Sequence, residues 1–398
     1  MRGVVYIYGS LMCALVLGLI SSSMTARLLT PRELGHYRFV ISCVTVAVSA
    51  STLGLFSSAG SLLAAPGKPT FRRMVTGGAS TQAWFVTVIA GLCVAIVLAT
   101  NRPDSISAGW LVASLLGGVM AWPLLLQETL RARGSFLGLS LLNAGPPLLF
   151  IALLLASKLS GMAIDSILCS TCYFLSQGVI AALLVFRSDY AAKFDRLGYI
   201  YLFKRNINLG LNVYWGTFLA ALTAQSGIFV LQAFRTPEEV GVFSLALTLT
   251  APLALLPSTV GTVYFNQLPG SPSFPKNVIR YAWLTATLIG IGFCITVPFA
   301  IHILYGEKYI SVTLPSEICG IGAILQGMGD VYNRYYLANR DTKFLLRNAF
   351  IVCVTAIVLG FAAGDVFGIL GASLARSCAS LVYVLSLAYY YHVARRRF

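Results

Sequence analysis

Polar and charged side chains recur every four residues in one apolar stretch of the chain. Gln326, Asp330 and Arg334 follow this spacing, and Asn333 lies beside them. Residues four apart share one face of an α-helix, so the four side chains form a polar stripe. Asp330 and Arg334 can pair there, which lowers the cost of burying either charge. The stripe predicts either a self-neutralised pair that orients two helical units, or a cavity wall that contacts substrate or carries a coupling proton.

A second candidate is Arg376, which lies in a later apolar stretch with no acidic residue within one helical turn. Its own face carries serines, which cannot neutralise it: Ser373, Ser377 and Ser380. A guanidinium that faces a cavity without a carboxylate partner is suited to bind an anionic group. Two alternatives remain open for Arg376. It either has an interhelical partner such as Asp330 or Asp365, or its side chain reaches a membrane interface.

The remaining polar side chains in the apolar stretches have less specific patterns. Three arginines are expected at the outer membrane interface rather than in a cavity: Arg27, Arg38 and Arg235. Five amides are expected either to bind ligand hydroxyls or to make packing hydrogen bonds: Asn143, Gln177, Asn212, Gln225 and Gln232. Cys169 and Cys172 have CxxC spacing, but small residues within a membrane helix favour close packing over metal or redox chemistry. We therefore expect no catalytic residues, no metal site and no cofactor.

Composition requires that these side chains lie in a membrane. Of the 398 residues, 58% are hydrophobic and only 10% are charged, whereas roughly 25% of a soluble domain is charged. The net charge of +15 would suit nucleic acid, but membrane proteins carry excess Lys and Arg on their cytoplasmic side. No basic stretch is long enough for a soluble binding domain. We predict an all-α polytopic membrane protein that binds no nucleic acid.

Twelve apolar runs are long enough to cross a bilayer, which takes about 20 residues. They are residues 3–26, 39–63, 79–100, 106–127, 137–157, 164–186, 207–234, 243–265, 281–303, 316–337, 348–367 and 369–391. The first run could pass for a signal peptide, but we expect it to be retained. Several runs contain prolines that can kink a helix, either beside a cavity or to improve packing: Pro123, Pro146, Pro147, Pro252, Pro257 and Pro298.

The chain repeats itself at a shift of about 206 residues. The turn Thr30-Pro31-Arg32-Glu33-Leu34-Gly35-His36-Tyr37 has an echo in residues 236–243, and residues 130–136 resemble 337–344. In each turn Pro stops the incoming helix and Gly supplies backbone freedom. Two matches at nearly one spacing predict two pseudo-symmetric six-helix lobes in the same orientation, at 1–186 and 207–398.

The distribution of Lys and Arg predicts the orientation in the membrane. The N-terminus, the even-numbered loops and the C-terminus carry 19 of these residues, and the odd-numbered loops carry 7. This asymmetry places both termini in the cytoplasm. The junction at 187–206 is then a cytoplasmic interfacial linker. Its apolar residues stand among basic ones and predict a helix on the membrane surface: Leu197, Tyr199, Ile200, Leu202 and Phe203.

Two stretches resemble a known family. Residues 26–37 resemble the first-loop signature of bacterial polysaccharide (O-antigen type) flippases, and residues 304–309 with 326–346 resemble their tenth-helix region. This family belongs to the multidrug/oligosaccharidyl-lipid/polysaccharide exporter superfamily. The resemblance implies two six-helix lobes around a central cavity that opens alternately to the two faces of the bacterial cytoplasmic (inner) membrane. It also implies a cargo of sugar units on a polyprenyl pyrophosphate, moved from the inner to the outer leaflet for surface polysaccharide synthesis.

The resemblance assigns roles to the candidate residues. Arg376 would hold the pyrophosphate, and the stripe of Gln326, Asp330, Asn333 and Arg334 would line an adjacent or opposite wall. The expected partners are membrane lipid, the lipid-linked oligosaccharide and other polysaccharide-assembly membrane proteins, with a proton or sodium gradient as the coupling source left open.

Two alternatives to a flippase remain open. A drug/cation antiporter of the same superfamily would call for acidic groups in the cavity, whereas this chain has more intramembrane Arg than unpaired acid. An integral-membrane glycosyltransferase or polymerase would need catalytic residues on a sizeable outer loop, and every odd-numbered loop is short. We therefore expect a transporter and not an enzyme.

Overall fold

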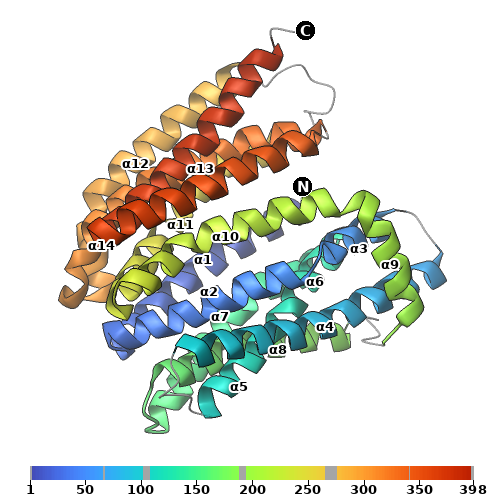
Figure 1. Cartoon of the computed structure of the whole chain (residues 1–398), viewed down its shortest axis with the longest axis horizontal. Helices are drawn as coiled ribbons and strands as arrows, with labels where there is room; N and C mark the ends of the chain where they lie inside the picture. The colour runs from blue at the N-terminus through green and yellow to red at the C-terminus, as the bar shows by residue number, and fades with distance from the viewer. Residues whose placement is uncertain are drawn as a thin grey trace. The chain divides into compact units, whose positions relative to one another are not determined.

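A computed structural model describes residues 2–65, 68–101, 108–187, 194–264, 276–339 and 341–395, and within these ranges all regular structure is helical (Figure 1). The chain divides into two compact units. The first contains Met1–Leu29 and Tyr37–Phe218, and the second contains Thr30–His36 and Leu219–Phe398. The first repeated turn therefore packs with the second unit, although it lies early in the chain.

The helices of the first unit and the junction are α1 (Arg2–Leu28), α2 (Pro31–Ser51), α3 (Leu55–Ala64), α4 (Pro69–Asn101), α5 (Ala108–Gly117), η2 (Gly118–Met120), α6 (Ala121–Arg133), α7 (Phe136–Leu159), α8 (Ser166–Arg187), α9 (Arg196–Leu209) and the start of α10 (Leu211–Phe234). The second unit continues with α11 (Pro237–Tyr264), α12 (Lys276–Tyr305), η4 (Glu307–Val312), α13 (Thr313–Ala338) and α14 (Thr342–Arg395).

Ten described helices are long and apolar enough to cross a membrane, or eleven when the bent pair α2 and α3 counts as one span. The apolar part of α14 alone covers 51 residues, far more than the roughly 20 that one crossing needs. Gly368 interrupts it with φ 57° and ψ −129°, so that α14 supplies two crossings. The structure confirms the prediction of an all-helical polytopic membrane protein with about twelve spans.

Local sequence signals explain where the repeated helices begin. Thr30 and Glu33 form a capping box, in which the Thr30 N–H donates to Glu33 Oε2 at 2.9 Å and the Glu33 N–H donates to Thr30 Oγ1 at 3.3 Å. Pro31 occupies the first helical position, where its missing N–H costs nothing. Helix starts then recur at the shift seen in the sequence. Helices α11, α12 and α14 begin 206, 207 and 206 residues after α2, α4 and α7.

The two repeated turns contact each other within the second unit. A Cβ atom added to Gly35 would lie 1.7 Å from the Pro237 carbonyl oxygen, and one added to Gly241 would lie 2.7 Å from the Pro31 oxygen. The first turns of α2 and α11 thus meet at a distance that only glycine permits.

The predicted span 39–63 is not one straight helix. It breaks between α2 and α3 with a bend of 61°, at Leu53 and Gly54, whose φ angles are 49° and 77°. No proline causes this break. In contrast, α11 is one continuous helix although it contains Pro252 and Pro257.

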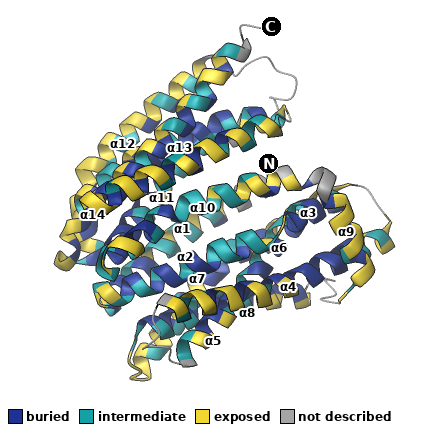
Figure 2. Cartoon of the chain, in the orientation of Figure 1, coloured by how far each residue is buried: buried dark blue, intermediate teal, exposed yellow. Residues whose placement is uncertain are grey.

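One face of helix α12 exposes large apolar side chains. Figure 2 shows exposed residues along this helix, and its large apolar side chains recur at helical spacing on the exposed face: Leu288, Ile291, Ile295, Phe299 and Ile303. An apolar stripe of this kind is stable against acyl chains rather than water. The opposite situation occurs between α13 and α14, where a buried core includes Met328, Tyr332, Tyr336, Tyr383 and Leu387.

Candidate functional site

The close packing of α13 on the second half of α14 positions the polar stripe. A Cβ on Gly322 would lie 2.6 Å from Ser377 Oγ, and a Cβ on Gly329 would lie 2.3 Å from the Tyr383 ring. The contacts advance in the same direction along both helices, so the two helices run parallel. Small residues on α13 therefore bring Tyr383 against the stripe.

Asp330 is bonded to α14. Tyr383 donates its hydroxyl to Asp330 Oδ1 at 3.0 Å, and Asn333 Nδ2 donates to the same Tyr383 hydroxyl at 2.7 Å. The Gln326 side chain also hydrogen-bonds the Asp330 carboxylate. Three of the four stripe residues thus meet in one network around a buried tyrosine. Sequence reasoning missed Tyr383, because it lies 53 residues from Asp330 in an apolar run.

Arg334 does not take part in this network. Its side chain is exposed and lies against Gly261 of α11, where a Cβ would be 3.1 Å from Arg334 Cγ. No carboxylate oxygen of the described residues lies within 4.0 Å of its guanidinium. Asp330 and Arg334 therefore make no ion pair within 4.0 Å, although the two charges interact electrostatically at longer range. The glycine of α11 lets Arg334 turn away, and Tyr383 satisfies the carboxylate in its place.

Arg376 lies seven residues before Tyr383, which places the two side chains on nearly the same face of α14. Its side chain is half-buried, and Nη1 donates to the Ala224 carbonyl oxygen of α10 at 3.3 Å. Within the described ranges no carboxylate oxygen lies within 4.0 Å of this guanidinium. A guanidinium has five N–H donors, and among the described residues Arg376 uses one of them. Neither Asp330 nor Asp365 is the interhelical partner considered from the sequence.

Arg235, one of the three arginines near the repeated turns, has a structural partner. Its Nε donates to the Gly364 carbonyl oxygen at 3.3 Å and its Nη2 donates to that of Asp365. These carbonyls precede the break at Gly368, where the helix leaves its last carbonyl groups without intrahelical partners. Arg235 therefore caps the first half of α14.

Arg38 occupies a different environment in the first unit. It is half-buried on α2, and its Nη2 donates to Ser22 Oγ of α1 at 3.1 Å. The guanidinium carbon lies 5.5 Å from the centre of the Tyr37 ring, a cation–π distance. Its Nε is buried without a hydrogen-bond partner among the described atoms. Arg38 is thus a second half-buried arginine with no carboxylate of the described residues within 4.0 Å.

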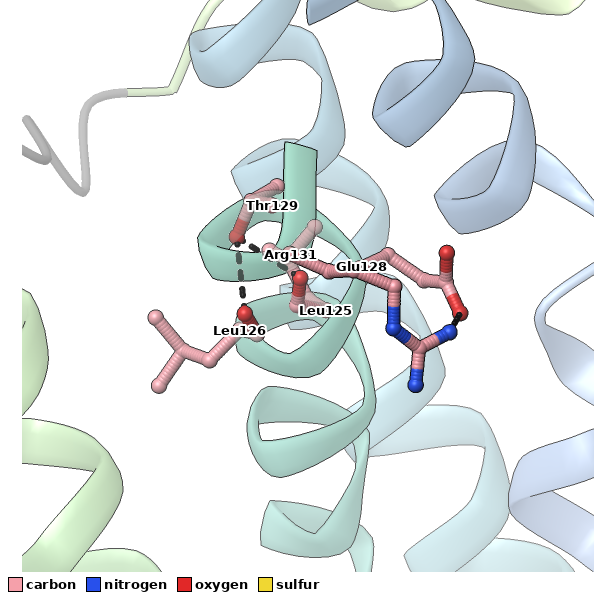
Figure 3. Close-up of polar contacts among 5 residues, drawn as sticks. All are labelled: Leu125, Leu126, Glu128, Thr129 and Arg131. Carbon is pink, nitrogen blue, oxygen red and sulfur yellow. Dashed lines mark hydrogen bonds and ion pairs between the residues drawn. The ribbon is translucent and has the colours of Figure 1, made fainter. Parts of the chain in front are cut away.

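Figure 3 shows the contrasting case of an arginine that does meet an acid. Arg131 Nη1 lies 3.4 Å from Glu128 Oε1, one turn apart on α6, and 61% of the Arg131 side chain is exposed. Thr129, between them, donates to the carbonyl oxygens of Leu125 and Leu126 at 2.8 and 3.2 Å. This pair is an exposed salt bridge at a helix end, which contributes about 0–1 kcal/mol. The half-buried arginines of α2 and α14 lack such a partner among the described residues.

The amides and cysteines singled out from the sequence have different surroundings. Gln177 hydrogen-bonds Tyr173, Gln232 Oε1 is buried without a partner among the described atoms, and the Asn212 side chain lies outside the described residues. Cys169 and Cys172 are buried free thiols on α8. Among the described residues no group of three or more His, Cys, Asp and Glu side chains could hold a metal ion.

The network around Tyr383 supports a direct prediction. Tyr383→Phe removes the donor to Asp330 and leaves the carboxylate less well satisfied, which we expect to lower the free energy of unfolding by about 1–3 kcal/mol. Tyr389→Phe on the same helix is the matched control, because that ring is 72% exposed. Unfolding of the purified proteins in mixed micelles measures both. Equal stabilities for the two variants would contradict the structural role of the Tyr383 hydroxyl.

The comparisons do not confirm the resemblance to the polysaccharide flippase family, but they do find similar structures. No family model matches the sequence, and no curated protein matches it. Solved structures do match. The lipid II flippase MurJ in an inward closed conformation has a TM-score of 0.76 and 15% identity, covering 96% of this chain and 87% of that one.

Two drug transporters also match over nearly their full lengths. The MATE multidrug transporter DinF-BH, solved in a ligand complex, has a TM-score of 0.67 and 15% identity, with 97% of this chain and 95% of that chain covered. An outward-facing multidrug resistance MATE family transporter of the MOP superfamily has a TM-score of 0.62 and 13% identity, with 100% of each chain covered. The chain therefore has the fold of the MOP superfamily transporters, which MurJ and the MATE proteins share.

Proposed function

We propose that the chain is an alternating-access flippase that moves polyprenyl-pyrophosphate-linked oligosaccharide from the inner to the outer leaflet of the bacterial cytoplasmic membrane. The observation that carries this proposal is Arg376, a half-buried guanidinium with one hydrogen bond to a backbone carbonyl and no carboxylate of the described residues within 4.0 Å. The sugar part of such a cargo is neutral or anionic, whereas its pyrophosphate is always anionic. A permanent cation therefore suits every member of this cargo class.

Further groups fit the same cargo. Arg38 supplies a second cation without a carboxylate of the described residues within 4.0 Å, on the first unit. The network of Gln326, Asp330, Asn333 and Tyr383 offers amide, carboxylate and hydroxyl groups that suit sugar hydroxyls. Among the matching structures, MurJ is itself described as a lipid II flippase. In this proposal Arg334 lines the cavity wall from the α11 side.

A drug/cation antiporter is the second candidate. Asp330 favours it, because this half-buried carboxylate has no cationic partner within 4.0 Å among the described residues. The MATE proteins, described as multidrug transporters, have the same fold. We rank it second because the half-buried guanidinium of Arg376 would repel an organic cation.

Transport in proteoliposomes separates the two functions. The probes are a fluorescent polyprenyl-pyrophosphoryl-N-acetylglucosamine, the corresponding uncharged polyprenyl glycoside, and a cationic rhodamine dye. We expect the pyrophosphate probe to cross the bilayer and the uncharged probe to cross much more slowly, because the cationic site recognises the linkage. Rhodamine transport without movement of either lipid probe would establish the antiporter instead.

Orientation, coupling and partners are further parts of the proposal. The charge asymmetry of 19 against 7 supports cytoplasmic termini, so that the cargo enters from the side where the basic loops lie. The energy source is a proton or sodium gradient, and surface polysaccharide assembly proteins of the same membrane receive the product. The lobes of the proposal are residues 1–186 and 207–398, joined by the interfacial linker 187–206.

A further inference from the structure

Helix α9, between the two halves of the chain, crosses the beginning of α4. A Cβ on Gly78 would lie 2.3 Å from the Gly198 carbonyl carbon, and a Cβ on Gly198 would lie 2.2 Å from the Met74 oxygen. Figure 1 shows α9 running across α4 rather than along it. The crossing lies between Arg73 and the apolar run that follows residue 78. Basic residues followed by an apolar run mark the level of lipid headgroups.

The two faces of α9 differ sharply. Gly198, Leu202 and Asn206 are buried at a spacing of four residues and form the face that packs on the protein. The outward face carries both apolar and basic side chains. Its apolar side chains include Leu197, which is 77% exposed, together with Ile200 and Phe203. Such a surface suits the boundary between headgroups and acyl chains, where basic side chains reach the headgroups from apolar stems.

The segments around the crossing of α9 and α4 carry many more basic than acidic residues. The exposed basic residues of α9, of the start of α4 and of the position just before α4 are Lys68, Arg72, Arg73, Arg196, Lys204 and Arg205. Between residues 68 and 85 and between 194 and 209 the one acidic residue is Asp195. Its carboxylate already accepts the Gly198 N–H at 2.9 Å and so caps α9. These two segments therefore leave their six cations without a dedicated counter-charge of their own.

We propose that the outward face of α9, together with the first turn of α4, binds the headgroups of anionic phospholipids. Charge complementarity and the exposed apolar residues point to a lipid surface, since a soluble acidic partner would leave Leu197, Ile200 and Phe203 in water. The ligand class is a phosphodiester lipid with a net negative headgroup, such as phosphatidylglycerol.

The inner face of α9 connects this surface to the break in the second span. Asn206 Nδ2 donates to the Leu53 carbonyl oxygen at 2.6 Å, and Asn206 Oδ1 accepts from Ser58 at 2.6 Å. Side chains of α10 and α4 satisfy two more carbonyls of the break: Tyr214 Oη donates to Ala50 at 2.7 Å and Gln82 Nε2 to Ser51 at 2.9 Å. Lipid that holds α9 in place therefore also stabilises the bent form of α2 and α3.

The first test measures lipid binding directly. The purified protein is titrated with phosphatidylglycerol and with phosphatidylcholine in detergent, and bound lipids are counted by native mass spectrometry. The variant is Arg196→Gln/Lys204→Gln/Arg205→Gln. The matched control removes three exposed cations from α12 and α14: Arg280→Gln, Lys343→Gln and Arg347→Gln. We expect the α9 variant to lose phosphatidylglycerol affinity by roughly fivefold for each cation removed, and the control to resemble the wild type. Unchanged binding in the α9 variant, or an equal loss in the control, overturns the proposal.

The second test uses the unaltered chain and so does not depend on how the variants fold. Hydrogen exchange is compared in nanodiscs of phosphatidylcholine alone and with added phosphatidylglycerol. We expect slower exchange in residues 196–206 and around the break at residues 50–58 when the anionic lipid is present. Identical exchange of both segments in the two bilayers overturns the proposal, and so does slowing confined to segments away from α9 and the break.

Discussion

Arg376→Gln is expected to abolish translocation of the pyrophosphate probe while the protein still inserts and folds. Glutamine keeps a donor for the Ala224 carbonyl oxygen, which Arg376 contacts at 3.3 Å, but it removes the charge. Loss of one partner from a buried charged hydrogen bond typically costs about 2–5 kcal/mol, roughly 30-fold or more in affinity. Arg376→Ala should lose transport as well, and lipid-linked glycan should accumulate in the inner leaflet.

Arg376→Lys tests the geometry separately from the charge. Lysine keeps the positive charge but loses the planar, bidentate donor arrangement, so we expect partial transport. Because arginine does not deprotonate in proteins, cargo is not released by titration of Arg376. Release must follow opening to water, where screening weakens the ion pair. Transport should therefore fall as ionic strength rises on the loading side.

The control for this series is Arg131→Ala, which removes an exposed arginine from its 3.4 Å pair with Glu128. We expect it to transport like the wild type, because exposed pairs contribute little. Translocation rates in proteoliposomes, measured at equal amounts of inserted protein, compare all variants. Normal transport by Arg376→Gln would show that Arg376 is structural. The cargo hypothesis would then lose the residue that carries it.

Gly35→Ala is expected to prevent stable folding, because its added Cβ makes the shortest contact of any described glycine. The new Cβ would lie 1.7 Å from the Pro237 carbonyl oxygen. That atom belongs to the backbone, so no rotation of a side chain relieves the overlap. The first turns of α2 and α11 must separate, at a cost at or above the usual 1–3 kcal/mol of overpacking.

Two other glycines make this a graded series. Gly241→Ala places a Cβ 2.7 Å from the Pro31 oxygen and should destabilise less than Gly35→Ala. Gly292→Ala meets no atom within 4 Å and should be neutral or stabilising by about 0.5–1 kcal/mol, because alanine favours a helix. Thermal unfolding and size-exclusion profiles of the detergent-solubilised variants rank the three. A Gly35→Ala protein as stable as Gly292→Ala would show that the two repeated turns do not meet as closely as described.

The sequence by itself determined the features that depend on short segments. About 20 apolar residues suffice to form a membrane helix whatever the neighbours are, so most described residues of the predicted spans are helical, with an interruption at residues 52–54 in the span 39–63. The Thr30 to Glu33 capping box and the prolines at 31 and 237 are equally local, and they set the starts of α2 and α11. The repeat is likewise evident from the amino-acid sequence alone, and the helices of the second half begin at the same shift of about 206 residues.

Tertiary structure decided the features that depend on contacts between distant segments. The second span breaks without a proline because Gln82, Asn206 and Tyr214 satisfy the carbonyls that the break exposes, and these side chains lie 31, 153 and 164 residues from their acceptors. Similarly, Asp330 bonds Tyr383 rather than Arg334, because glycines of α13 admit the tyrosine ring and Gly261 lets the arginine turn aside. Spacing along one helix shows which side chains share a face. It does not show which neighbouring helix approaches closely enough to satisfy them.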